Sequence, residues 1–140
     1  MDIKTVKMDL RRIKYGRKNV IALQSELEKR KSHLEYLKSC RPTKDNRERI
    51  AALERTIEVR VSEINRKQED IDRLQNSYLV AIDSLSELDR VIIMQGYIEG
   101  VSYKTLGAKL GYSERGIQER IVRIIDEITF VMTINEKKGL

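Results

Sequence analysis

The chain has little of what builds a β-rich, disulfide-stabilised or membrane-spanning protein. Aromatic residues make up 5% of its 140 residues, and Pro42 is the only proline. So few large rings cannot fill an extensive sheet core, whereas abundant Leu, Ile, Glu, Lys and Arg favour long helices. The single cysteine, Cys40, cannot form an internal disulfide, and no apolar run reaches the roughly 18 residues of a membrane span. We therefore expect an all-α, cytoplasmic protein without a membrane segment or a secretory signal.

Residue types that carry catalysis or bind metals are also scarce. His33 is the only histidine, and neither it nor Cys40 stands in a ligand or catalytic spacing. The glycines from Gly96 to Gly116 follow no expected strand, and no Gly-Lys-Ser or Gly-Lys-Thr of a phosphate-binding loop follows them. The sequence therefore predicts no enzyme, no metal site and no cofactor.

The positive charge is concentrated in the first part of the chain. Residues 1–79 hold 20 Lys and Arg against 13 Asp and Glu, whereas residues 80–140 hold 8 against 9. A basic cluster favours nucleic acid or an acidic partner, although a solvated helix face has the same composition. The densest basic stretch is a candidate accessory patch, and an alternative hypothesis makes it the main nucleic-acid contact: Lys4, Lys7, Arg11, Arg12, Lys14, Arg17 and Lys18.

Two seven-residue repeats predict two long helices. The first repeat contains Val6, Ile13, Val20, Leu27 and Leu34, and the second contains Ile50, Ile57, Ile64, Ile71, Tyr78 and Leu85. Such repeats keep one face of each helix against a partner, and Pro42 breaks the chain between them. We expect an antiparallel, coiled-coil-like hairpin over residues 1–82, with Asp45 and Glu48 as a capping box for the second helix.

A second row of positions, which begins at Ile3 and also recurs every seven residues, should pack beside the first repeat. This companion row is only partly apolar. Ile3 and Leu10 are apolar, but the later positions hold Arg17, Gln24 and Lys31. Charged residues at core positions weaken an isolated pair of helices, so we expect a homo-oligomer or docking of the hairpin on the rest of the chain.

Residues 83–140 are expected to form a small helix-turn-helix domain. A first helix should run to about Tyr97, with Tyr97 or Ile98 as its last inward residue, and Gly100 should break it. Ser102 and Ser113 are positioned to cap the two helices of the motif, Gly107 to let them touch, and Gly111 to adopt a positive φ. The inward stripe of the last helix is expected to be Ile117, Ile121, Ile124, Ile125, Ile128 and Met132.

The second helix of the motif carries side chains suited to reading DNA. Arg bonds guanine bidentately, Gln bonds adenine, and Glu accepts from cytosine, so the expected base-reading residues are Glu114, Arg115, Gln118 and Glu119. The expected phosphate contacts are Ser113, Arg120, Arg123, Lys104 and Lys109.

This segment resembles a known family. Tyr97-Ile98-Glu99-Gly100, Leu106-Gly107, Leu110-Gly111-Tyr112-Ser113 and Ile117 match the pattern of the region-4 helix-turn-helix of sigma-70-type factors, over about a third of the chain. The size and layout, with an N-terminal helical segment, resemble small phage and prophage regulators of late-gene transcription, the ArpU/RinA-like group. The resemblance implies binding to double-stranded DNA near a promoter in a bacterial host cell, and contact with RNA polymerase. It places base reading at the same positions, 114, 115, 118 and 119.

Two other interpretations stay open. The hairpin and C-terminal domain together also suit a protein–protein adaptor that binds RNA polymerase or belongs to a phage DNA-packaging apparatus. The C-terminal domain is slightly acidic, so it also suits a three-helix fold without a DNA role.

Overall fold

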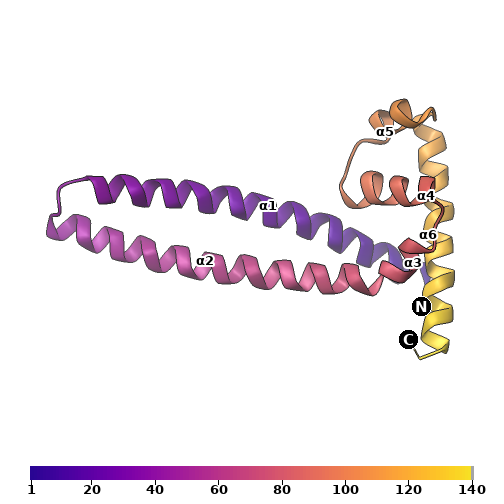
Figure 1. The fold of residues 1–140 in the computed structure, drawn as a ribbon, viewed down its shortest axis with the longest axis horizontal. Coiled ribbons are helices and arrows are strands. Elements are labelled where there is room, and N and C mark those ends of the chain that lie inside the picture. The colour runs from indigo at the N-terminus through magenta and orange to yellow at the C-terminus, as the bar shows by residue number, and fades with distance from the viewer. Residues whose placement is uncertain (140) are drawn as a thin grey trace. The chain divides into compact units, whose positions relative to one another are not determined.

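The computed structural model describes residues 1–139, and its regular elements in that range are all helical (Figure 1). They are α1 (Ile3–Ser39), α2 (Lys44–Ser77), α3 (Leu79–Asp83), α4 (Glu87–Val91), the π-helix η1 (Ile92–Ile98), α5 (Tyr103–Leu110) and α6 (Glu114–Lys137). The all-α expectation is confirmed. Across residues 1–139, none of these helices has the length and apolar content that a bilayer crossing requires.

The helices divide into two compact units. Residues 16–70 form one, and residues 1–15 join the described chain from Ile71 onward to form the other. This division differs from the expected boundary between residues 82 and 83. The start of α1 belongs with the C-terminal helices because Val6, Leu10 and Ile13 are completely buried. The amino group of Met1 also pairs with Glu136 at 2.6 Å.

The unit of residues 16–70 is an antiparallel helical pair (Figure 1). Lys67 Nζ of α2 donates to Asn19 Oδ1 of α1 at 3.2 Å. The expected capping box is wrong: α2 begins at Lys44, and Thr43 caps it by accepting from the Asn46 amide at 3.1 Å. Asp45 lies inside the first turn and instead pairs with Arg49 at 3.2 Å.

The buried seam of α1 follows the predicted seven-residue repeat but changes its companion row. Val20, Leu27 and Leu34 are buried, as expected. Beyond residue 16, the companions are the half-buried Leu23 and the buried Leu37, each three residues after a repeat position. Positions 24 and 31, which hold Gln and Lys, lie exposed. The helix therefore buries the row that contains Leu23 and Leu37 rather than the row assumed from its first turns.

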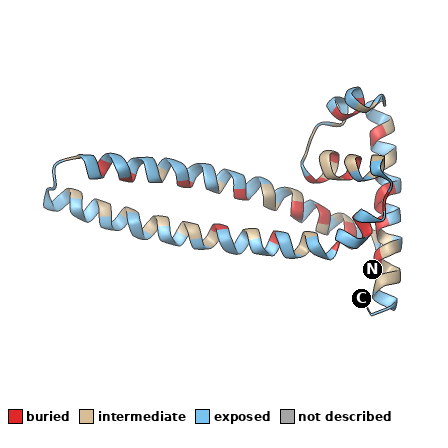
Figure 2. Ribbon diagram, in the orientation of Figure 1, coloured by how far each residue is buried: buried red, intermediate tan, exposed pale blue. Residues whose placement is uncertain are grey.

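The other unit has its core along α6. All six residues of the expected inward stripe, Ile117 to Met132, are buried, and α6 packs against α3, α4, α5 and η1. Residues 78–85, which include α3 and its flanking turns, add four buried side chains: Tyr78, Ala81, Ile82 and Leu85. Figure 2 marks the buried and exposed residues along these helices.

The helix before the motif changes its winding. Ser86 caps α4 by accepting from the Asp89 amide at 3.2 Å, and from Ile92 the chain continues as a π-helix to Ile98. The wider winding adds about one residue to a turn, so Ile98 comes towards the side of Ile93. Both isoleucines are buried, and Tyr97 is left half-exposed. Ile98, and not Tyr97, is therefore the last inward residue.

Candidate nucleic-acid interface

The helix-turn-helix has the caps and the turn that its sequence predicts. Ser102 Oγ accepts from the Thr105 amide at 3.1 Å at the start of α5. Gly111 ends that helix in the left-handed region with a φ of 81°. Ser113 Oγ accepts from the Gly116 amide at 3.0 Å and so begins α6. Residues close in sequence therefore define the start of α6.

Gly107 brings the two helices of the motif into close contact. Its carbonyl accepts from the Tyr112 amide at 2.8 Å. A Cβ on Gly107 would lie 2.4 Å from the Tyr112 carbonyl oxygen, which is closer than any real contact. Only glycine fits there without moving the turn, so the direction in which α6 leaves the turn depends on this position.

The four expected base-reading residues lie exposed on the first turns of α6. We call Glu114, Arg115, Gln118 and Glu119 the reading face. The buried Ile117 and Ile121 mark the opposite side of the helix. The side chains of Arg115 and Glu119 are 87% and 67% exposed and form an ion pair at 3.2 Å. Such an exposed pair contributes only ~0.3–0.5 kcal/mol, so a base edge can replace it at little cost.

The expected phosphate contacts divide into two groups. Lys104, Lys109 and Arg123 lie exposed, in keeping with a backbone contact. Ser113 is also exposed, and its oxygen accepts the capping bond while its hydroxyl group remains able to donate. The N–H groups of the first turn of α6 add donors that suit a phosphate.

Arg120 is held inside the unit rather than presented to a ligand. Its Nη1 donates to Asp89 Oδ1 at 3.1 Å, and its guanidinium lies 4.8 Å from the centre of the Tyr112 ring. The side chain is only 27% exposed. These contacts favour a positioning role, in which Arg120 ties α6 to α4 and to the turn, and its contact with a phosphate stays a prediction. Asp89 lies 31 positions away in the sequence, so the ion pair could not be predicted from local residue spacing.

Gly116 leaves a hollow beside the reading face. The hollow is lined by Tyr112, Gly116, Glu119, Arg120, Val122 and Arg123. A Cβ on Gly116 would lie 3.1 Å from Ser113 Oγ, the atom that caps the helix. Glycine therefore preserves the cap geometry at the start of α6, which offsets part of its low helix propensity.

The basic stretch of α1 is only partly solvated. Lys4, Arg11, Arg12 and Lys18 lie exposed, whereas Lys7, Lys14 and Arg17 are half-buried. Arg11 and Lys14 line a cleft with three tyrosines, Tyr15, Tyr97 and Tyr103. Sequence reasoning did not assign Tyr97 or Tyr103 to a site, because their approach to α1 depends on the packing of the whole unit.

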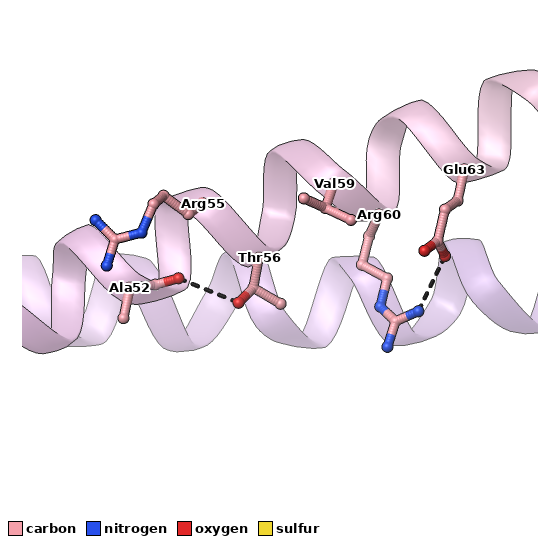
Figure 3. Close-up of a pocket in the computed structure, with 6 residues that line it drawn as sticks. All are labelled: Ala52, Arg55, Thr56, Val59, Arg60 and Glu63. Carbon is pink, nitrogen blue, oxygen red and sulfur yellow. Dashed lines mark hydrogen bonds and ion pairs between the residues drawn. The ribbon is translucent and has the colours of Figure 1, made fainter.

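A second hollow lies on α2 and offers no comparable chemistry (Figure 3). The Thr56 hydroxyl donates to the Ala52 carbonyl at 3.1 Å, and Arg60 pairs with Glu63 at 3.0 Å. Val59 adds an apolar side chain between them. Throughout residues 1–139, no three His, Cys, Asp or Glu side chains are grouped to hold a metal ion.

Comparison with models of protein families, with curated proteins and with solved structures found no match to this chain. A functional conclusion therefore depends on the residues and on their geometry. The most specific arrangement is the reading face, which a capped helix presents beside a turn of defined shape.

Proposed function

We propose that this protein is a sequence-specific DNA-binding transcription regulator in which the start of α6 enters the major groove. The observation that carries the proposal is the reading face. Four polar or charged side chains lie exposed on the first turns of a helix whose other side is buried. This is the arrangement by which a recognition helix presents its N-terminal residues to base edges.

The chemistry of the reading face suits direct readout. Arg115 has a planar pair of donors for guanine, and Gln118 has a donor and an acceptor for adenine. Glu114 and Glu119 offer acceptors to the amino group of cytosine. Lys104, Lys109 and Arg123, together with Ser113, supply contacts to the backbone that orient the helix without reading sequence.

Charge favours an assembly larger than one chain. Residues 80–140 hold 8 basic against 9 acidic residues, so one helix-turn-helix gains little affinity from phosphate neutralisation. A homo-oligomer built through the helical pair would double the backbone contacts. The resemblance to sigma region 4 and to the phage late-gene regulators supports action at a promoter, in the cytoplasm of a bacterial host, with RNA polymerase as a partner.

The proposal is tested by measuring how the double variant Arg115→Ala, Gln118→Ala binds labelled DNA duplexes, compared with the wild type. Each lost base contact should cost about 1–3 kcal/mol, so specific affinity should fall at least tenfold while non-specific affinity is retained. The control Arg47→Ala, Gln24→Ala removes the same two side chains from exposed helical positions of the other unit. Unchanged specific binding in the first variant contradicts the assignment of the reading face.

A protein–protein adaptor is the second candidate. The near-neutral charge of residues 80–140 favours it, as do the exposed apolar side chains Ile21, Tyr36 and Val59 of the helical pair. Salt dependence separates the two functions, because phosphate-driven binding weakens steeply between low and moderate salt. Absence of DNA binding at low salt would favour the adaptor.

A further inference from the structure

The start of α1 and the helix-turn-helix enclose a small basic, aromatic cleft. Arg11, Lys14 and Tyr15 of α1, Tyr97 of η1 and Tyr103 of α5 line a space of about 330 Å³. We call it the tyrosine cleft. All five residues belong to the same compact unit, so the cleft is part of one folded body.

The cleft is positively charged and has no compensating carboxylate. Its lining holds two cations, three phenols and no acidic side chain. The two acidic residues among the first 15 of the chain are engaged elsewhere: Asp2 accepts from the Thr5 amide at 2.8 Å, and Asp9 accepts from the Tyr78 hydroxyl. No described carboxylate forms an ion pair with Arg11 or Lys14, so their charge is available to an anion.

The three tyrosines add hydrogen-bond donors and aromatic faces to the two cations, and this combination suits a phosphate ligand. A phenol hydroxyl donates a hydrogen bond, and an aromatic face packs against a sugar or a base. A phenol hydroxyl is protonated and able to donate at neutral pH, and burial, followed by the nearby Tyr97, raises the pKa of Tyr103 further. Tyr103 also packs over Gly96, where a Cβ would lie 3.5 Å from the ring atom Cε1. The ring is thereby held in place rather than free in solvent.

We propose that the tyrosine cleft binds a backbone phosphate of duplex DNA, outside the base pairs that α6 reads. Tyr103 is the first residue of α5, and the exposed Lys104 follows it directly. In a helix-turn-helix the first helix of the motif crosses the DNA backbone. The cleft therefore continues the backbone contact of α5 onto α1 and brings basic charge to a C-terminal domain that has little of its own. This inference rests on the proposed DNA-binding function and adds a second contact to it.

The test compares Arg11→Gln, Lys14→Gln with the matched pair Lys29→Gln, Lys38→Gln. The control residues are exposed on α1 and lie in the other unit. Both double variants remove two positive charges, so the change in net charge is the same. DNA affinity is measured by fluorescence anisotropy at several salt concentrations, on a selected site and on unrelated duplexes. Thermal unfolding of each variant establishes that it is folded.

We expect the cleft variant to lose about fivefold to tenfold in affinity near 0.1 M salt on every duplex, with its salt slope less steep by about 1. Sequence preference should be retained, in contrast to the Arg115 variant. Tyr103→Phe should weaken binding in the same sequence-independent way.

Two results would overturn the cleft assignment alone, while wild-type DNA binding persists. One is a loss no larger than that of the matched control pair. The other is a loss of affinity confined to the selected site, which would place the cleft among the base-reading contacts. Absence of wild-type DNA binding at low salt would instead overturn the proposed function itself, and the cleft assignment with it.

Discussion

At the scale of single residues, Gly107 governs how closely α5 and α6 approach. The Tyr112 carbonyl occupies the space that a side chain at this position would need. Gly107→Ala should destabilise the fold by about 2 kcal/mol, because displacement of the turn outweighs the ~1 kcal/mol gained in helix propensity. Urea unfolding measures the change. Gly116→Ala is the comparison, since its Cβ would meet a hydroxyl oxygen at 3.1 Å and the Tyr112 Cβ at an ordinary 3.9 Å. Equal effects of the two substitutions would contradict this account of the turn.

Tyr78 links the end of α2 to the start of α1. Its hydroxyl donates to Asp9, and burial, followed by the interaction with Asp9, raises its pKa well above the ordinary value of about 10. A group whose folded pKa is raised contributes stability fully below its unfolded pKa and loses it as pH rises. Tyr78 should therefore stabilise the fold up to about pH 10 and progressively less above it.

Tyr78→Phe tests this pH dependence. The variant should be about 1–2 kcal/mol less stable at neutral pH, because Asp9 loses its donor. The difference from wild type should shrink as pH rises above about 10. Urea unfolding from pH 7 to pH 11 gives the profile, and Tyr36→Phe, at an exposed ring, is the control. A difference that stays constant across the alkaline range would contradict the account.

At the scale of elements, Arg120 connects three of them. Its guanidinium pairs with Asp89 of α4, lies over the Tyr112 ring of the turn, and belongs to α6. Because both partners of the ion pair are mostly buried, at 27% and 17% exposure, the pair is shielded from solvent more than a surface pair.

A double-mutant cycle of Asp89→Ala and Arg120→Ala measures this connection. We expect a coupling free energy of about 1 kcal/mol between the two side chains. Asp89→Ala alone should also destabilise the fold, because it leaves the guanidinium without its carboxylate. A coupling free energy near zero would contradict the positioning role and favour a contact between Arg120 and a backbone phosphate.

The sequence could predict the local features of this fold, but it could not predict the contacts between distant segments. Ser102, Gly111 and Ser113 were assigned correctly because caps and turns depend on residues within about four positions. The inward stripe of α6 was correct because its period is regular. The Asp89–Arg120 pair and the tyrosine cleft were not predicted, since they depend on how distant segments pack. The companion row of α1 was misassigned because Ile3 and Leu10 set an expectation that Leu23 and Leu37 reverse.

At the scale of the whole molecule, charge and assembly are coupled. The C-terminal helix-turn-helix is close to neutral, whereas the basic residues concentrate in the first 79 positions. If oligomerisation supplies the missing backbone contacts, the protein should have a solution mass of at least twice its 16.4 kDa, by analytical ultracentrifugation. A monomer with full DNA affinity would contradict this account of how affinity arises.

The central claim is that the start of α6 reads DNA bases. Selection of duplexes from a random-sequence pool tests it most directly, with the wild-type protein and Arg115→Ala compared in parallel. The account predicts that the wild type enriches a defined motif, and that Arg115→Ala relaxes the preference for guanine at one position of that motif while the others persist. A wild-type protein that enriches no motif, or a motif identical in the two proteins, would contradict it.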